Sequence, residues 1–457
     1  MEITPLKRSM KTTGVLLIIL SAITPASSVF IIAPTVMQQA GTGAFISFMI
    51  AAVIGIFTAQ VYAELSSAFP LTGGEYAIVG RILGPFWGFI VLGVNLISLI
   101  FMLSALSLGI ATYLQPLFPH VPTIAAGVAA IVATTFLGVL NIRTNAVITG
   151  AFLILEMLAL IVLTWLGFAN ISRPLTEFLT HPVFLNSSGA LQPTSLSLIG
   201  LATAVAVWAY NGYGNTVYLG EETHDAPKRM ARIIIWSLII TVIAEAVPVT
   251  AVLLGAPDLA GLLGSKNMLP DFIIARGGMQ LNILVSLGVA LAIINANVAT
   301  ILITARQLYS TGRDHVWPHW INHALTRIHK KYHSPWIATL VCGALSVAAC
   351  FLDMQLLFVI IGSSLVFIYG ALCVAVLVGR RKGSTDHGHY RMPWYPLPPI
   401  LALIAMFYTV FANYLDAEVG RPSLWATLGM MVLSGLYYRF YLRRRGEWIL
   451  HAPEEEK

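Results

Sequence analysis

The sequence predicts an all-α membrane protein with twelve transmembrane helices, of which the first ten form two inverted repeats of five. Composition, the spacing of apolar runs and a pair of helix interruptions predict this fold class. Of the 457 residues, 57% are hydrophobic and 10% are charged, whereas a soluble domain carries about 25% charged residues. Because so few polar side chains cannot cover a water-soluble globule, the composition excludes a soluble enzyme, a disordered chain and a nucleic-acid-binding protein.

Twelve apolar runs approach or exceed the roughly 20 residues that a membrane-spanning helix needs. They cover residues 14–39, 43–69, 84–115, 121–141, 145–168, 196–222, 231–256, 279–312, 335–352, 356–379, 396–415 and 424–442. No remaining stretch is long enough for a soluble domain with its own core. The expected organisation is a cytoplasmic N-terminus (1–13), a first repeat (14–168), a second repeat (196–379), two further spans (396–442) and a cytoplasmic tail (443–457).

Charge distribution predicts the orientation of these spans. If the N-terminus is cytoplasmic, 22 of the 26 Lys and Arg residues fall in cytoplasmic segments, and the outer segments hold only Arg173, Lys266, Arg276 and Arg421. Cytoplasmic loops of membrane proteins carry an excess of Lys and Arg. We therefore expect both termini in the cytoplasm and a multi-pass protein of the plasma membrane, specifically a bacterial inner membrane.

Two of the predicted spans cannot be regular helices. The first contains Thr-Pro-Ala-Ser-Ser at 24–28, where Pro25 lacks an N–H and its ring clashes with the preceding turn. The sixth contains Asn-Gly-Tyr-Gly-Asn at 211–215, and each glycine destabilises a helix by about 0.5–1 kcal/mol. Since the breaks recur after five spans, an odd number, the second unit is inverted relative to the first. Paired interruptions of this kind indicate a transporter's binding site; an ordinary proline kink with glycine packing contacts is the alternative.

Half-helix ends at such interruptions suit a small charged solute. Their N-termini present N–H groups to anions and their C-termini present carbonyl groups to cations. A zwitterion such as an amino acid fits both.

Two acidic residues, Glu156 and Glu245, lie well inside predicted spans, and no intramembrane Lys or Arg is available to pair with them. An acidic group at this depth costs about 2.5–3.5 kcal/mol on insertion scales. Taking a proton relieves that cost, as proton coupling requires, so both are candidate coupling residues. Two other interpretations stay open: a carboxylate that holds a cationic substrate, or a protonated side chain without a role in transport.

Histidines on the predicted cytoplasmic side do not form a convincing metal site. Pro318 interrupts the first pair with HxxxH spacing, so the helical face cannot be regular. No HExxH, Walker A or GxSxG motif is present. We expect no metal, no cofactor and no enzymatic activity. The histidines concerned are His315, His319, His323, His329, His333, His387 and His389.

Three motifs in order along the chain resemble the amino acid–polyamine–organocation (APC) superfamily of transporters. Each motif begins at the cytoplasmic end of a predicted span and continues beyond it. They are Glu64-Leu65, Phe69-Pro70 and Gly73-Gly74-Glu75-Tyr76 at the end of the second span; Glu221-Glu222 and Pro227-Lys228-Arg229 at the end of the sixth; and Arg306 to Tyr309, Arg313-Asp314 and Pro318 at the end of the eighth.

The resemblance implies a five-plus-five inverted-repeat fold, with spans eleven and twelve outside it, and alternating access around a site between spans one and six. Family members place Gly-Ser-Gly in the first interruption, where its N–H groups hold the substrate carboxylate. The matching residues here are Ala26, Ser27 and Ser28, and Pro25 removes a further donor. An amine without a carboxylate is therefore an alternative substrate. Glu156 stands near a position where some proton-driven members have Lys.

These observations predict a secondary active transporter for a small amino acid, amine or polyamine, working as a proton symporter. A substrate–product exchanger is the alternative within the same family; an ion channel or an intramembrane enzyme is the alternative of another class. Trp208 matches a gating aromatic of the family. Substrate, protons and membrane lipids are the expected partners, with no nucleic acid, and the sequence leaves the oligomeric state open. The expected substrate-binding residues are Ala26, Ser27, Ser28, Val29, Trp208, Tyr210, Asn211, Gly212 and Asn297.

Overall fold

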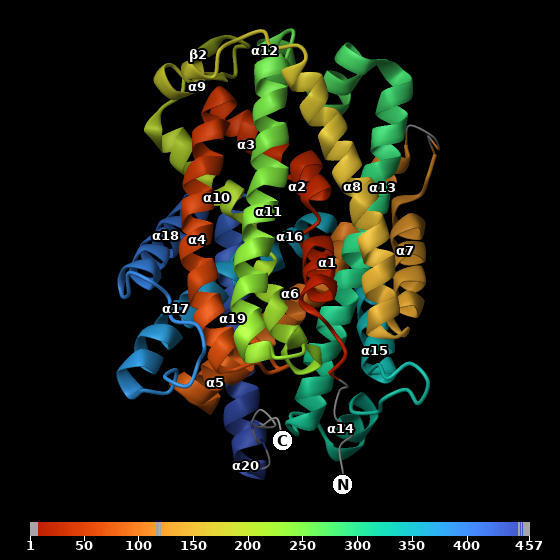
Figure 1. Ribbon diagram of the computed structural model, residues 1–457, viewed down its shortest axis with the longest axis vertical. Coiled ribbons are helices and arrows are strands. Elements are labelled where there is room, and N and C mark those ends of the chain that lie inside the picture. The colour runs from red at the N-terminus through yellow and green to blue at the C-terminus, as the bar shows by residue number, and fades with distance from the viewer. Residues whose placement is uncertain (1–7, 116–117, 119, 447, 449, 451–457) are drawn as a thin grey trace.

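The structure is a bundle of helices standing side by side, with one short β-hairpin at one end (Figure 1). It is a computed structural model that describes residues 8–115, 118, 120–446, 448 and 450. Parts of the predicted cytoplasmic termini, residues 1–7 and 451–457, lie outside the described residues. The mainly helical architecture agrees with the composition, because only helices and closed barrels satisfy every backbone group within a membrane.

The helices follow one another with short connections. The first part of the chain contains α1 (Thr12–Ile23), α2 (Pro25–Ile31), α3 (Ala33–Ala40), η1 (Gly41–Gly43), α4 (Ala44–Ala68), α5 (Glu75–Leu83), α6 (Pro85–Leu114), α7 (Thr123–Gly138), α8 (Ile142–Phe168) and α9 (Thr176–Thr180). The antiparallel hairpin of β1 (Val183–Leu185) and β2 (Leu191–Pro193) follows.

The second part begins with another interrupted segment. It contains α10 (Leu196–Ala209), the 3-10 helix η2 (Tyr213–Glu222), α11 (Ala226–Gly255), α12 (Leu259–Gly264), α13 (Met268–Arg313), α14 (His319–Leu325), α15 (Trp336–Ala349), α16 (Met354–Gly362) and α17 (Ser364–Lys382). The chain ends with α18 (Leu397–Leu415), α19 (Gly420–Tyr437), the π-helical turn η3 (Tyr438–Leu442) and α20 (Arg443–Arg445).

The bundle has two distinct ends (Figure 1). The hairpin, α9 and α12 lie at one end, called here the outer end, and α5, α14 and α20 lie at the opposite end, called the inner end. The inner end is the one that the charge distribution predicts to face the cytoplasm.

Eight segments of the described chain are long and apolar enough to cross a membrane. They are Thr12–Ala68, Pro85–Leu114, Ile142–Phe168, Leu196–Glu222, Ala226–Gly255, Met268–Arg313, Leu356–Lys382 and Leu397–Leu415. The first has 57 residues and contains two of the predicted spans; two shorter apolar helices, α7 and α15, occupy two others. The protein is thus a multi-pass membrane protein, while the count of twelve and the inverted relation of the repeats stay predictions.

The interrupted segments lie in the centre of the bundle. Helix α1 packs against α8, α11, α13 and η2, and α2 packs against α8, α11, α13 and α10. Helices α1 and α2 lie one above the other (Figure 1). Residues from both predicted repeats therefore surround the first interruption.

Several boundaries differ from those that hydrophobicity predicts. The predicted span 356–379 is two helices, α16 and α17. Helix α13 begins eleven residues before the predicted span 279–312, with a kink at Gly278 (φ 83°). Apolar content locates buried segments but does not distinguish one continuous helix from two helices joined by a kink.

Candidate functional site

The first interruption consists of one residue. Thr24 has left-handed backbone angles (φ 50°, ψ 70°), α1 ends at Ile23, and Pro25 is the first residue of α2. Proline is favoured there because its fixed φ suits a helix start and its missing N–H would have no partner in the helix. The interruption is thus shorter than the predicted 24–28, since Ala26 and the two serines after it are already helical.

The second interruption separates α10 from η2. Helix α10 ends at Ala209, and Gly212 has a φ of 123°, which side-chain-bearing residues rarely adopt. A Cβ atom on Gly212 would lie 2.7 Å from Cγ1 and 3.3 Å from Cα of Ile23. The two interruptions therefore touch, and the contact requires glycine. After it the chain winds as a 3-10 helix to Glu222 rather than as the predicted α-helix.

Gly212→Ala should destabilise the protein and reduce uptake for two reasons. The new Cβ would clash with Ile23, and the positive φ of residue 212 costs an alanine about 1–2 kcal/mol even without a clash. Thermal unfolding in detergent checks the expected drop in Tm. Gly109→Ala in α6 is the matched control, since a Cβ there has no heavy atom within 4 Å and alanine favours a helix interior. Equal Tm values for both variants would contradict the close contact.

Glu156 reaches the first interruption from α8. Its side chain is fully buried, and its Oε1 accepts a 2.8 Å hydrogen bond from the main-chain N–H of Ala26. The hydroxyl of Thr24 lies 3.1 Å from the same Oε1 and 2.8 Å from the hydroxyl of Ser27. The other carboxyl oxygen, Oε2, has no hydrogen-bond partner among the described residues. Glu156 therefore binds both the non-helical residue and the start of α2.

Glu245 reaches α2 from α11, on another side. It is 1% exposed, and its Oε2 accepts a 2.9 Å hydrogen bond from Ser28, whose hydroxyl also lies 3.1 Å from the carbonyl oxygen of Ala209. Within the described part of the chain, Oε1 of Glu245 has no hydrogen-bond partner. Neither Glu245 nor Glu156 forms an ion pair with a described residue. The carboxyls of Glu245 and Glu156 interact electrostatically. The structure thus brings the two predicted coupling residues to one short helix.

Two residues of the second interruption contribute polar groups. Tyr210 is 1% exposed, packs edge-on against Phe48, and its hydroxyl has no partner among the residues described. Asn211 accepts a 2.7 Å hydrogen bond from the hydroxyl of Tyr369 on α17. Tyr369 in turn belongs to an aromatic cluster with Tyr62 and Tyr213.

The remaining predicted site residues are less closely tied to the interruptions. Val29 is buried within α2, and Trp208 is half-buried near the end of α10. Asn297 donates a 2.8 Å hydrogen bond to Ser107 of α6. Asn295, which the sequence reasoning missed, lies next to Glu156. Residues two apart on a helix point about 200° apart, which explains why Asn295 and Asn297 face different neighbours.

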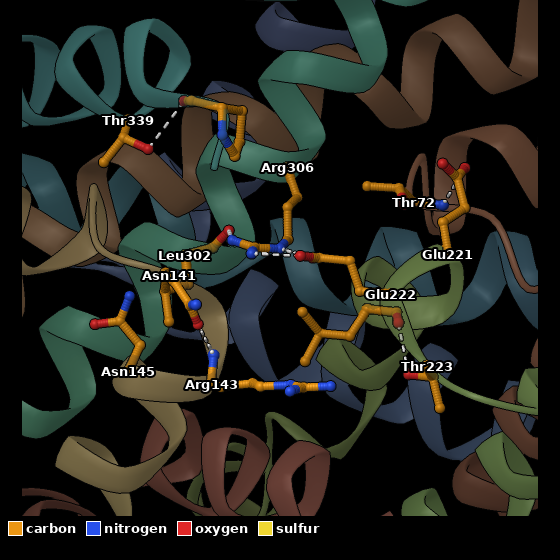
Figure 2. Close-up of polar contacts among 12 residues, drawn as sticks. Thr72, Asn141, Arg143, Asn145, Glu221, Glu222, Thr223, Leu302, Arg306 and Thr339 are labelled. Atoms are coloured by element: carbon orange, nitrogen blue, oxygen red, sulfur yellow. Dashed lines mark hydrogen bonds and ion pairs between the residues drawn. The ribbon is translucent and has the colours of Figure 1, made fainter. Parts of the chain in front are cut away.

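The charged residues of the sequence motifs form a separate network, part of which is drawn in Figure 2, between η2, α13 and the segment before α5. Arg306 of α13 forms a buried ion pair with Glu222, the last residue of η2, in which its Nη2 lies 3.0 Å from Oε1. Its Nη1 donates to the carbonyl oxygen of Leu302 at 2.9 Å. This double contact with the carboxylate fixes the end of η2 against α13.

A second ion pair lies beside the first. Arg313 contacts Glu221 at 2.6 Å, and the other carboxyl oxygen of Glu221 accepts a 2.9 Å hydrogen bond from the N–H of Thr72. Tyr76 donates a 2.8 Å hydrogen bond to Asp314. The three motifs, far apart in sequence, therefore meet in space, but as a structural connection between η2, α13 and the segment before α5 rather than as the binding site.

Across the described residues, no group of three or more His, Cys, Asp and Glu side chains is placed to hold a metal ion. The polar groups at the two interruptions are instead carboxyl, hydroxyl and amide groups. They can exchange protons and accept hydrogen bonds from a cationic group.

Comparison with known proteins identifies the family. The family model described as amino acid permease matches residues 11–436. The chain belongs to this amino acid permease family of the APC superfamily. The predicted resemblance is confirmed, and membership makes this permease a transport protein and not an enzyme.

Relatives of this permease carry different kinds of solute, as their names state. A branched-chain amino acid permease of Bacillus subtilis, BcaP, is 24% identical over 97% of this chain and 94% of its own length. The BcaP of Lactococcus lactis is 26% identical over 92% of each chain. A low-affinity putrescine importer of Escherichia coli, PlaP, is 19% identical over 85% of this chain and 84% of its own.

Proposed function

We propose that this permease is a secondary active transporter that carries a small amino acid or organic amine across the plasma membrane, a bacterial inner membrane, in symport with protons. The observation that carries the proposal is the contact between two interrupted helices at a pair of buried carboxyls. Main-chain groups freed at helix ends and buried acidic side chains are both costly in a membrane. Their meeting at one place is explained by a site that binds a charged solute.

The position of the interruptions supports alternating access as the mechanism. Helices α1 and α2 belong to the proposed repeat 14–168, and α10 and η2 belong to the proposed repeat 196–379. Between them lie the contact of Gly212 with Ile23 and the 3.1 Å approach of the Ser28 hydroxyl to the carbonyl oxygen of Ala209. A rocking motion of one repeat against the other changes these contacts and opens the site to one side at a time.

The contacts of Glu156 provide a physical route for proton coupling. An ionised carboxyl makes charge-assisted hydrogen bonds, which are roughly twice as strong as neutral ones. Glu156 accepts such bonds from Thr24 and Ala26 at the first interruption. Protonation of Glu156 would weaken these hydrogen bonds, so the charge on Glu156 would control how strongly α8 binds the start of α2. Glu245, which interacts with Glu156, is the second proposed proton-binding group.

Uptake into proteoliposomes tests the proposal. Purified protein should accumulate a labelled amino acid or amine when the outside is more acidic, with saturation and with competition by unlabelled substrate. A proton ionophore should abolish the accumulation. Uptake that is indifferent to the pH gradient but requires unlabelled solute inside the vesicles would indicate the exchanger instead. Ion currents far above carrier rates would contradict both.

A further inference from the structure

The start of α2 has little capacity to hold a substrate carboxylate. Pro25 has no N–H, the N–H of Ala26 donates to Glu156 at 2.8 Å, and the N–H of Ser28 donates to the carbonyl oxygen of Thr24 at 3.0 Å. Three of the four residues 25–28 therefore offer no N–H to a ligand. The acidic group bound at the start of α2 is the protein's own Glu156 carboxyl. A substrate carboxylate placed here would also meet the charge of Glu156.

Three buried oxygen atoms near the start of α2 need a hydrogen-bond donor rather than an acceptor. Oε1 of Glu245 and the hydroxyl of Tyr210 lack hydrogen-bond partners within the described structure, as does Oε2 of Glu156, although the amide of Asn295 lies next to that carboxyl; Glu156, Glu245 and Tyr210 are each at most 1% exposed. Glu156 and Tyr210 both interact electrostatically with Glu245. All three residues lie around α2: Glu156 contacts Ala26, Glu245 contacts Ser28, and Tyr210 follows Ala209, whose carbonyl oxygen lies 3.1 Å from the Ser28 hydroxyl. Leaving buried polar groups without partners is costly, most of all for charged ones.

An ammonium group matches these acceptors. It carries three N–H donors and no acceptor, whereas an ionised carboxyl only accepts. The phenol of Tyr210, which interacts electrostatically with Glu245, can also accept a hydrogen bond. A ligand that brought a carboxylate to the same location would place a like charge beside two acidic side chains, which is unfavourable.

We propose that Glu245 and Tyr210 form an ammonium-binding subsite and that the transported substrate is a small organic amine without a carboxylate. This inference rests on the proposed function and names its substrate class. Ser28 orients the carboxyl of Glu245 through its 2.9 Å hydrogen bond, so that the free Oε1 is left for the ligand. Glu156 contributes negative charge nearby while its Oε1 stays bound to the first interruption.

Ligand-induced stabilisation of the full-length protein in detergent tests the substrate class. The probes are 1,4-diaminobutane and 2-aminoethanol as free amines, and leucine and alanine as zwitterions. A ligand that binds only the folded state raises Tm, so the two amines should raise it and the two zwitterions should not. In proteoliposomes, excess 1,4-diaminobutane should block uptake of labelled 2-aminoethanol, and excess leucine should leave it unchanged.

Two variants test the assigned residues. Glu245→Gln should weaken amine binding about 100-fold, and Tyr210→Phe about 10-fold, since one hydrogen bond to a charged group contributes roughly 1.5–3 kcal/mol. Glu177→Gln and Tyr414→Phe are the matched controls, because both residues are exposed and lie on α9 and α18, which carry no residue of the site. Both controls should bind amines as the wild type does. Tyr210→Phe and the wild-type competition assay decide the matter even if Glu245→Gln does not fold.

The results separate this inference from the proposed function. If leucine or alanine stabilises the wild type and is accumulated while the amines are not, the ammonium subsite is wrong and the transporter stands. Unchanged amine affinity in folded Glu245→Gln would also overturn the subsite alone. If neither class of solute binds or accumulates, both proposals fail.

Discussion

Replacing Glu156 with glutamine should abolish concentrative uptake while leaving the permease folded. Glutamine has nearly the same shape, and its amide oxygen can still accept the hydrogen bonds from Ala26 and Thr24. It cannot ionise, so a pH gradient no longer changes the strength of these bonds. The ratio of inside to outside substrate at steady state should therefore fall to about 1, the value for transport that only equilibrates its solute.

The measurement is steady-state accumulation of labelled substrate in proteoliposomes at several outside pH values. Counterflow, in which unlabelled substrate inside drives entry of label without a pH gradient, should persist in Glu156→Gln and so show that the carrier is intact. Glu177→Gln, an exposed residue of α9, should concentrate substrate as the wild type does. Undiminished pH-driven accumulation in Glu156→Gln would exclude Glu156 as the coupling group.

Arg306→Ala should lower the free energy of unfolding by about 3–5 kcal/mol, the typical cost of removing one partner of a buried ion pair. The side chains of Arg306 and Glu222 are 1% and 2% exposed. Removing the guanidinium leaves the Glu222 carboxyl without its ion-pair partner in a water-poor environment. Thermal or denaturant unfolding in detergent, followed by tryptophan fluorescence, measures the loss.

Two comparisons make the origin of this loss clear. Arg229→Ala removes an exposed pair with Asp225, whose side chains are 37% and 48% exposed, and should cost only about 0.3–0.5 kcal/mol. The double variant Arg306→Met with Glu222→Gln should recover most of the loss, because no uncompensated charge is left. If Arg306→Ala were as mild as Arg229→Ala, the pair would not be shielded from water.

The local causes of the two interruptions could be predicted from the sequence, and the contacts between them could not. Pro25 and Gly212 act through their own backbone properties, so their positions suffice. Glu156 and Glu245 could be placed at depth by counting residues along a helix. That Glu156 takes the N–H of Ala26 depends on helix packing across 130 residues of chain, which no local pattern reveals.

Rotation of a helix about its own axis was the other information that the sequence lacked. In a soluble helix, polar and apolar faces indicate which side is buried, but α13 is apolar on most sides. The sequence therefore predicts Asn297 as a site residue and gives no reason to choose Asn295, although the structure places Asn295 beside Glu156. Similarly, glycines at 212 and 214 predicted an interruption, but not that the chain beyond it would continue as a 3-10 helix.

The 3-10 conformation makes η2 longer than an α-helix of the same ten residues would be. A 3-10 helix rises about 2.0 Å per residue and an α-helix about 1.5 Å, so the ten residues of η2 extend about 5 Å further than they would as α-helix. Glu221 and Glu222 stand at the far end of this segment. Rewinding would retract both carboxylates by more than the reach of an ion pair, so Arg306 and Arg313 would either release them or be pulled along. η2 thus connects the second interruption to the inner end, and a change in its helical pitch would displace Glu221 and Glu222 along the axis of the segment.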